Sequence, residues 1–572
     1  MRFTLPALLA LSLPLALAAC ESDPGPPGDA GAPIDRPALD ASDDIGAKPD
    51  AAVEDIPPED VPAPDVPATI EPFNASPRGS FPRGFLWGSA TAPYQIEGGL
   101  THTDWARWEE MPNRILHGDR ADDGPQSLTR FTADLDALVE SGQNSYRLGV
   151  DWSRIFPTRD AWQRCAAAAS MPLADFHTAC LAAADPAGVA YYHSVFAAMA
   201  QRRLTPMVTL QHFVLPDYLN DLSQPFDGQG FARPGIVDDF YAWARFAGRE
   251  YGAEVDWWIT LNEPIVVVAG GYLQGVFPPG APLNWDLIRR VVTNMIRAHA
   301  RGYDALHEAD TATAQSSGDA GAARPAWVSI ASHNRVFRAA NPVNANDQAA
   351  AEAARYVNNL LFLNAIVRGD LDADADGSVM GPTDLRNDPS LRARADFIGV
   401  NYYGLTLTRG VPALPILRGI PQQVGLPTPL PKSDLAWDIY PQGFLLVLRE
   451  AAQYGLPILV TENGVADAVG TNRQRFLAEH LAILARAVSE GVDVRGYYHW
   501  SIVDNFEWAE GFCPRFGLYR VDYSNAERAR TPTPAAMTYR SIIEANAVSD
   551  ALLTSLPAYA PPRYCHPSDG GT

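Results

Sequence analysis

The chain has few cysteines, few basic residues and no long apolar segment. Five cysteines in 572 residues are too few for a small scaffold held together by disulfides. Lysine and arginine number 44 against 67 acidic residues, a net charge of −23. This argues against nucleic acid as a partner, because proteins bind its phosphates mainly through basic side chains. The longest apolar segment, residues 3–19, is shorter than the roughly 20 residues that a membrane-spanning helix needs.

This apolar segment has the features of an export signal. Arg2 precedes it, and it ends in Leu17-Ala18-Ala19-Cys20. That ending resembles a bacterial lipobox, in which the cysteine is lipidated and becomes the first residue of the mature protein. An ordinary signal peptide with a chance cysteine is the alternative. We therefore expect a signal peptide over residues 1–19 and an exported cell-envelope lipoprotein, held at a membrane only by a lipid on Cys20.

The segment after Cys20 has the composition of a disordered tether. Residues 21–70 contain 11 prolines, 13 acidic residues, 2 basic residues and no aromatic residue. Such a stretch buries too little apolar surface to offset its ordering entropy, and proline with like charges keeps it extended. We expect a linker over residues 20–72, one folded domain over 73–548 and a C-terminal tail over 549–572.

Eight short apolar runs alternate with longer helical patterns along the folded domain. Near-continuous apolar strands separated by helices are typical of a parallel sheet that is covered on both faces. Eight such units predict an α/β fold, the (β/α)8 or TIM barrel, with its active site at the C-terminal ends of the strands. The runs are residues 85–90, 146–150, 206–210, 255–261, 327–331, 397–400, 458–460 and 496–500.

Two carboxylates follow predicted strands, Glu263 after the fourth and Glu462 after the seventh. Because the ends of the strands meet at one mouth of a barrel, we expect the two side chains to face each other. Two opposed carboxylates are what glycosidic bond cleavage requires, one to protonate the leaving oxygen and one to act as base or nucleophile. Either glutamate alone would more often be a solvated residue in a turn.

Four further motifs occur in order around these glutamates. They are FLWGSATAPYQIEGG at 85–99, YRLGVDWSRIFP at 146–157, TLQHFVLP at 209–216 and WSIVDNFEW at 500–508. With the two glutamates, they resemble family 1 of the glycoside hydrolases, the β-glucosidase and β-glycosidase family, over residues 81–539. The resemblance implies a retaining β-glycosidase that needs no metal or organic cofactor. Its expected substrates are small β-glucosides, or β-galactosides or β-fucosides.

The resemblance implies Glu263 as general acid/base and Glu462 as nucleophile. Glu263 has to be protonated near neutral pH, so we expect apolar surroundings and a nearby like charge to raise its pKa. Glu462 has to stay ionised, and the resemblance implies that Arg147 and Tyr403 stabilise and orient it. Asn262 would bind the sugar 2-hydroxyl. The other sugar-binding residues that the resemblance implies are Gln95, His212, Asn401, Trp500, Glu507 and Trp508.

Glu507 indicates which class of sugar the site accepts, and the two catalytic glutamates bear on the alternative function. Relatives that take 6-phosphosugars lack this glutamate, and a carboxylate here would repel phosphate. The alternative from another class is a non-catalytic carbohydrate-binding lipoprotein on the same fold. Such proteins usually lose one catalytic carboxylate, whereas this chain has both Glu263 and Glu462.

Weaker signals concern cysteines and acidic residues. In an exported protein, Cys165–Cys180 and Cys513–Cys565 are plausible disulfides, although the sequence alone does not fix the pairing. The first pair lies in an alanine-rich insertion, residues 159–186, which we expect to wall the outer part of the substrate site.

Residues 372–377 resemble the start of a calcium loop, but Thr383 stands where the loop needs a glutamate. A solvated acidic loop is favoured, and no metal is assigned. Residues 411–431 are expected to form a loop at the entrance.

Overall fold

The computed structural model describes residues 70–281, 283–314, 325–411 and 422–565. The predicted signal peptide, Cys20 and the linker up to residue 69 lie outside the described residues. Within these residues, no helix combines the length and the apolar character that crossing a membrane requires.

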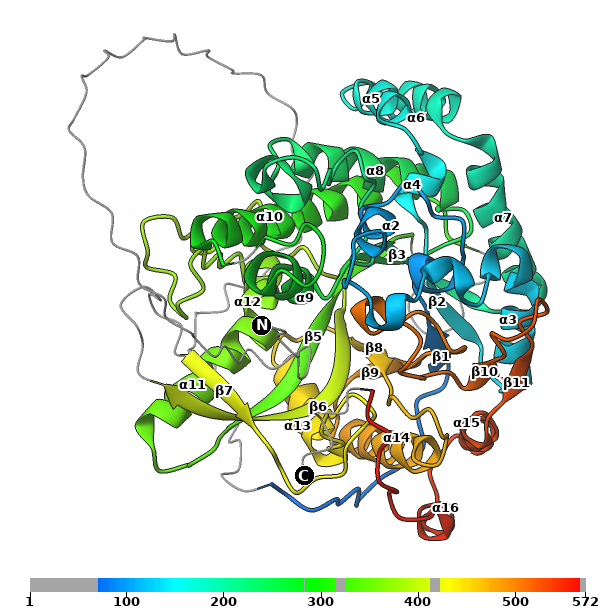
Figure 1. Cartoon of the computed structure of the whole chain (residues 1–572), viewed down its shortest axis with the longest axis vertical. Coiled ribbons are helices and arrows are strands. Elements are labelled where there is room, and N and C mark those ends of the chain that lie inside the picture. Colours follow the sequence, from blue (N-terminus) through cyan, green and yellow to red (C-terminus); the bar gives the residue numbers. More distant parts are fainter. Residues whose placement is uncertain (1–69, 282, 315–324, 412–421, 566–572) are drawn as a thin grey trace. The chain divides into compact units, whose positions relative to one another are not determined.

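Eight parallel strands form a closed barrel, which confirms the predicted fold class (Figure 1). Their order is β5-β4-β3-β2-β1-β9-β8-β6, and β6 pairs with β5 to close the ring. The strands are buried along almost their whole length, because side chains fill the barrel and helices cover it, and this explains the continuous apolar runs. The barrel strands are β1 Leu86–Ala90, β2 Ser145–Gly149, β3 Thr205–Gln211, β4 Trp257–Asn262, β5 Trp327–Ala339, β6 Ile398–Val411, β8 Ile458–Asn463 and β9 Val494–Trp500.

Long helices surround the barrel and turn their apolar sides inward, as in α14, whose interior positions are almost all buried. The long helices are α3 Ser127–Glu140, α7 Pro186–Gln201, α8 Ile236–Tyr251, α10 Trp285–Ala309, α11 Ala345–Arg355, α13 Pro441–Ala452, α14 Arg473–Ser489 and α15 Pro534–Ala545. Short helices are α1 Pro93–Ile96, α2 Asp104–Glu109, α4 Trp152–Ile155, α9 Pro264–Val267 and α12 Leu361–Leu363. Single turns and π-helical segments are η1 Leu116–Gly118, η2 Ala121–Asp123, η3 Phe226–Gly228, η4 Gly230–Ala232, η5 Val268–Gln274, η6 Tyr356–Leu360, η7 Asn364–Arg368 and η8 Trp508–Glu510.

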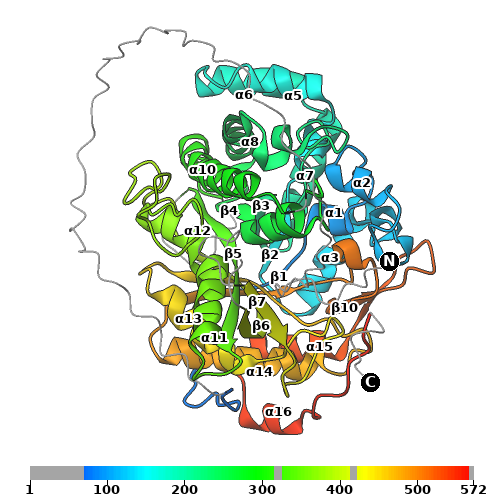
Figure 2. The same cartoon turned by 60° about the vertical axis from the view of Figure 1, so that its left-hand side comes forward.

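Strands β5 and β6 continue well past the barrel, which the apolar runs did not predict. After a register shift, Val336–Ala339 pairs with Leu405–Thr408. β7, Gln422–Leu426, then adds to β6 in antiparallel direction, so part of the predicted loop at 411–431 is a strand. α11 packs against β5, β6 and β7 (Figure 2). A small antiparallel pair, β10 Tyr519–Val521 and β11 Arg530–Pro532, follows the barrel.

The alanine-rich insertion folds into two helices, α5 Arg159–Ala166 and α6 Leu173–Ala183, joined by the disulfide Cys165–Cys180. Both pack on the outer helix α8 (Figure 1), where the Trp162 indole donates to Asp239 at 2.8 Å. None of the described residues that line the central cavity belongs to this insertion. The insertion therefore does not line the central cavity, and its place at the outer part of the substrate site stays a prediction.

Both ends of the described chain are fixed to the barrel. At the N-terminal end, the amide of Asn74 donates to Gln442 of α13 at 3.0 Å. After α16, Asp550–Ser555, the C-terminal segment returns along α14, where the amide of Ala560 donates to Asn472 at 2.8 Å. A disulfide between Cys565 and Cys513 ties its end to the loop after β9.

Candidate functional site

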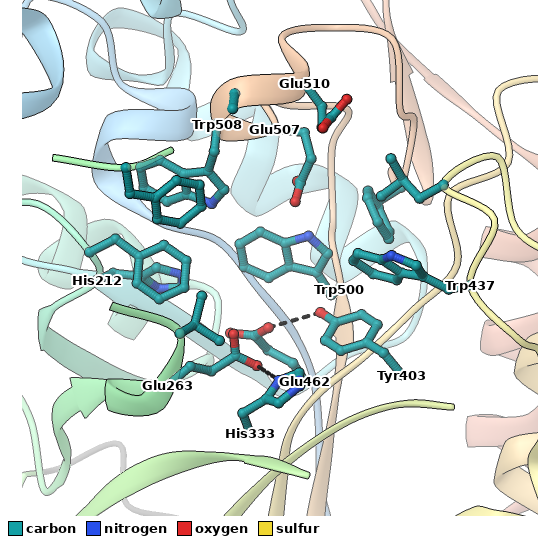
Figure 3. Close-up of a pocket in the computed structure, with 16 residues that line it drawn as sticks. His212, Glu263, His333, Tyr403, Trp437, Glu462, Trp500, Glu507, Trp508 and Glu510 are labelled. Atoms are coloured by element: carbon teal, nitrogen blue, oxygen red, sulfur yellow. Dashed lines mark hydrogen bonds and ion pairs between the residues drawn. The ribbon is translucent and has the colours of Figure 1, made fainter. Parts of the chain in front are cut away.

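A cavity opens at the C-terminal ends of the strands, and it collects acidic and aromatic side chains from many loops (Figure 3). Glu263 and Glu462 lie beside each other at its base, and Trp500 lies above them in this view. The lining residues are His212, Phe213, Glu263, Val266, Phe277, His333, Tyr403, Leu435, Trp437, Glu462, Trp500, Glu507, Trp508, Ala509, Glu510 and Phe516.

Glu462 is the last residue but one of β8, and two hydrogen-bond donors hold its carboxylate. Arg147 of β2 donates from Nη1 to one carboxylate oxygen at 2.8 Å, and the Tyr403 hydroxyl of β6 donates to the other at 2.8 Å. All three side chains are buried. Burial raises the pKa of Glu462 to about 7, and the charge of Glu263 adds to this, while Arg147 and Tyr403 act in the opposite direction. The two donors thus fix the orientation of the Glu462 carboxylate. With a pKa of about 7, Glu462 loses its proton near neutral pH.

Glu263, directly after β4, has a left-handed backbone, with φ of 40° and ψ of 59°. This conformation is costly for a residue with a side chain, and it is found mainly where function requires it. The amide of Glu263 donates to the carbonyl of Ala331 on β5 at 2.8 Å, which fixes the turn. Phe213 and Trp508, which also line the cavity, have positive φ as well. The backbone is therefore bent at three points where it presents a side chain to the cavity.

The surroundings of Glu263 differ from the predicted ones. His333 Nδ1 lies 3.0 Å from Oε1 of Glu263, and Asn401 donates to the same oxygen at 3.0 Å. Burial favours the protonated form, but the positive charge of His333 and these hydrogen bonds outweigh it, so the pKa of Glu263 lies below its usual range. The prediction of a raised pKa is wrong for this arrangement. The prediction assumed that only apolar residues and a second carboxylate surround Glu263, and it did not include His333.

A layer of buried amides connects the two glutamates. Asn262 accepts from Arg147 at 2.7 Å and from Asn401 at 3.2 Å through the same oxygen, and it donates to Nε2 of His212 at 3.0 Å. Burial and the charge of Arg147 hold the pKa of His212 well below its usual value, so the ring is neutral and accepts at Nε2. Because each amide has a defined partner, their orientations are fixed before a ligand binds.

Aromatic rings form one wall of the cavity. The His212 ring is stacked near Trp500 and Trp508, with centroids 5.6 and 6.0 Å apart. On the other side, Trp437 meets Tyr403 edge to face at 5.4 Å. Flat apolar faces beside polar groups suit a molecule such as a sugar, which carries C–H faces and hydroxyl edges.

The cavity has an excess of acidic groups. Burial raises the pKa of Glu507 to about 8, and the charges of Glu462, Glu510 and Glu263 add to this, while a hydrogen bond from Gln95 opposes it. Glu507 is therefore largely protonated near neutral pH, and its charge alone does not repel a phosphate. No lysine or arginine is among the described residues that line the cavity, so nothing there balances a phosphate dianion.

The structure brings all the predicted site residues together, but in two layers. Glu263, Glu462, Tyr403, His212, Trp500, Glu507 and Trp508 line the cavity. Arg147, Asn262, Asn401 and Gln95 lie behind them. Arg147 holds Glu462, Asn401 holds Glu263, and Asn262 links Arg147 to Asn401. Gln95 Nε2 donates to the carbonyl of Phe506 at 2.8 Å. The prediction missed His333, Trp437 and Glu510. His333 follows the fifth apolar run, so its position at a strand end was a usable signal.

The three aspartates of the loop at 372–377 lie apart from the cavity. One carboxylate oxygen from each of Asp372, Asp374 and Asp376 lies within 4.8 Å of the others. Asp372 also accepts from the amide of Gly377 at 2.8 Å. The loop amides thus satisfy part of this acidic cluster without an ion.

The model of "Glycosyl hydrolase family 1" matches residues 77–164 and 178–548. The Pyrococcus woesei β-galactosidase is 32% identical over 81% of this chain and 97% of its own length. The β-glucosidase A of Thermotoga maritima is 30% identical over 82% and 98%. The crystal structure of the Thermosphaera aggregans β-glycosidase superposes with a TM-score of 0.71 at 26% identity, covering 84% of this chain and all of that one.

Proposed function

The chain belongs to glycosyl hydrolase family 1, and from this premise we propose that it is a retaining β-glycosidase that removes terminal non-reducing β-D-glucosyl groups, with β-D-galactosyl and fucosyl groups as alternatives. Short oligosaccharides and aryl or alkyl β-glucosides are the proposed substrates. The observation that carries the proposal is the pair of buried carboxylates, Glu263 and Glu462, at the base of one cavity with unlike partners. Unlike environments are what give two carboxyl groups different roles in one reaction.

The pKa of Glu263 lies below its usual range and that of Glu462 is about 7, so the pair holds one proton between these two values. In the proposed mechanism, the reactive form has this proton on Glu263: Glu462 attacks the anomeric carbon while Glu263 gives the proton to the departing oxygen. The bond from carbon to the leaving oxygen breaks, and a glycosyl ester forms on Glu462. Arg147 and Tyr403 favour the ionised nucleophile. Once the ester has formed, Glu462 carries no charge. Glu263, now a carboxylate, takes a proton from water, which attacks the anomeric carbon and releases the sugar with its original configuration.

The proposed preference for neutral sugars rests on the lack of a lysine or arginine among the described residues that line the cavity. Four glutamates, Glu263, Glu462, Glu507 and Glu510, line it, together with histidines but with no described lysine or arginine. A phosphorylated sugar would bring two further negative charges into this buried space. Both β-glucosidases and β-galactosidases are among the relatives, so galactosides are the second substrate to test.

Hydrolysis of an aryl β-glucoside tests the proposal. We expect the wild type to release the phenol, Glu462→Ala to lose at least about four orders of magnitude in kcat, and NMR to find the β-anomer formed first. The alternative, a non-catalytic carbohydrate-binding protein, predicts that wild type and Glu462→Ala are equally inactive on glucosides, galactosides, fucosides and cellobiose while both bind sugar. A first-formed α-anomer would contradict the retaining mechanism.

We also propose that the enzyme is exported and anchored in the cell envelope through a lipid on Cys20, which lies outside the described residues. The support is the lipobox-like Leu17-Ala18-Ala19-Cys20 after an apolar segment. Expression of the full chain with radiolabelled palmitate should label the wild type but not Cys20→Ala, and the variant should leave the membrane fraction. Equal membrane partitioning of both proteins would refute the anchor.

A further inference from the structure

His333 is the one histidine that contacts a carboxylate of the cavity, among the residues that the structure describes. It lies on β5, between the barrel proper and the extension of the strand, and its side chain is fully buried. Its Nδ1 is 3.0 Å from Oε1 of Glu263 (Figure 3). Nothing in the family motifs or in the proposed mechanism accounts for this contact.

The contact determines which oxygen of Glu263 can hold a proton. With His333 in the tautomer that carries its proton on Nδ1, Oε1 accepts from two neighbours, His333 and Asn401, both at 3.0 Å. An oxygen that already accepts two hydrogen bonds is a poor site for the acidic proton, because the proton would meet the two donors. The proton of the carboxylic acid is thereby directed to Oε2.

We propose that His333 is a positioning residue that reserves Oε1 of Glu263 as an acceptor, directs the acidic proton to Oε2, and stabilises the carboxylate left after proton donation. This inference rests on the proposed function, in which Glu263 protonates the leaving group. His333 itself transfers no proton: the O–H bond of Glu263 breaks, a new O–H bond forms on the leaving oxygen, and the hydrogen bond from His333 Nδ1 strengthens as charge develops on Glu263.

The electrostatics of the cavity support this role. Glu462, Glu507 and Tyr403 face Glu263 as acidic groups, and Arg147 and Arg335 face it as cations. Burial raises the pKa of Glu263, but the charge of His333 and its hydrogen bond are the largest effects that lower it. Without His333, the neighbouring carboxylates and burial would prevail. Glu263 would become a weaker acid and a stronger base.

The experiment compares four full-length proteins: wild type, His333→Asn, His333→Leu and Ser332→Ala. Asparagine keeps a hydrogen-bond donor without the imidazole ring, whereas leucine removes the donor as well. Ser332, the preceding buried residue on β5, serves as the control for packing. Each protein is assayed for kcat/KM against pH with cellobiose, whose leaving group needs a proton, and with 2,4-dinitrophenyl β-glucoside, whose leaving group does not. Thermal unfolding establishes that each variant is folded.

For His333→Leu we expect the limb of the kcat/KM profile that reports Glu263 to move up by about one pH unit or more, since the pKa of the acid rises. The value of kcat/KM should fall roughly tenfold for cellobiose, because the proton is no longer directed to Oε2, and stay within about twofold for the dinitrophenyl glucoside. His333→Asn should lie in between, and it alone suffices if the leucine variant does not fold. An unchanged pH profile in the two variants, or equal losses on both substrates, would overturn the role of His333. Inactivity of the wild type on both substrates would instead overturn the proposed function.

Discussion

Arg147 and Glu462 form an ion pair at the base of the cavity, with Nη1 2.8 Å from Oε1 and both side chains almost completely buried. Removing the cation leaves the carboxylate charged in a medium that stabilises it poorly. We predict that Arg147→Met raises the pKa of Glu462 above its value of about 7. Since the proposed nucleophile must be ionised, a smaller fraction of the enzyme is then in the reactive form, and kcat/KM at pH 6 should fall by about 100-fold.

Arg154→Met provides a matched control for this prediction. Arg154 and Glu97 are also a buried pair at 2.8 Å, but neither residue lines the central cavity. This variant should lower the melting temperature and leave kcat/KM at pH 6 nearly unchanged. An identical loss of kcat/KM in both variants would mean that the effect comes from general loosening of the barrel.

Glu507 should lower the stability of the protein above neutral pH. Its folded-state pKa is about 8 against an ordinary 4.5, so folding disfavours the ionised form. This loss of folding stability is absent below pH 4.5, where Glu507 is protonated in the folded and the unfolded state. It grows as the pH rises to about 8. We predict that Glu507→Gln raises the free energy of unfolding by on the order of 1 to 3 kcal/mol at pH 8.5 and changes it little at pH 4.5. Urea denaturation at the two pH values measures this, and equal gains at both would contradict it.

The barrel could be predicted because parallel strands buried on both faces leave continuous apolar runs. All eight runs became strands, some displaced by a residue, as 146–150 against Ser145–Gly149 in β2. The extensions of β5 and β6 could not be predicted in this way. Polar residues such as Arg335 and Arg338 interrupt the apolar run of β5, and they are buried because distant segments cover them. A search for continuous apolar runs does not detect such a strand.

The site could be predicted as a set of residues but not as a network. Motifs identified Glu263, Glu462 and their neighbours, because each motif ends a strand at the same mouth. The ionisation of Glu263 was mispredicted, since it depends on His333, which is 70 positions away in the chain and 3.0 Å away in space. Burial and partners set a pKa, and neither is visible in a local motif.

A cluster of two histidines and two glutamates joins α7 to α6 and α8. His193 contacts Glu250 at 2.8 Å and Glu254 at 2.7 Å, and His177 contacts Glu250. Hydrogen bonds to these two glutamates raise the pKa of His193 to about 9. Its stabilisation is therefore complete below pH 6.5 and is lost as the pH rises through about 9.

We predict that His193→Gln lowers the melting temperature by a few degrees at pH 6 and by much less at pH 10. The effect should be modest even at pH 6, because His193 is partly exposed and solvent weakens the interaction. Calorimetry at the two pH values measures it, with Ser194→Ala, an exposed neighbour on α7, as control. A loss that is the same at both pH values would show that packing, and not charge, is what His193 contributes.

The two disulfides should differ in what they do for activity. Cys513–Cys565 closes a separation of 52 residues and fixes the loop that bears Ala509, Glu510 and Phe516 of the cavity wall. Cys165–Cys180 closes 15 residues and lies in the insertion on α8. Loop-closure entropy assigns them roughly 4 and 3 kcal/mol of stabilisation, so both double serine variants should melt earlier.

Only the Cys513→Ser/Cys565→Ser variant should also raise KM, because Cys565 packs in the same apolar cluster as Trp500 and Phe516, and releasing it frees one wall of the cavity. We expect an increase of about threefold to tenfold in KM for an aryl glucoside, measured well below the melting temperature of each variant. The Cys165→Ser/Cys180→Ser variant should keep the wild-type KM within experimental error. If both variants kept it, the disulfide at the C-terminal end would serve stability alone, and the loop after β9 would be held in place by its own packing.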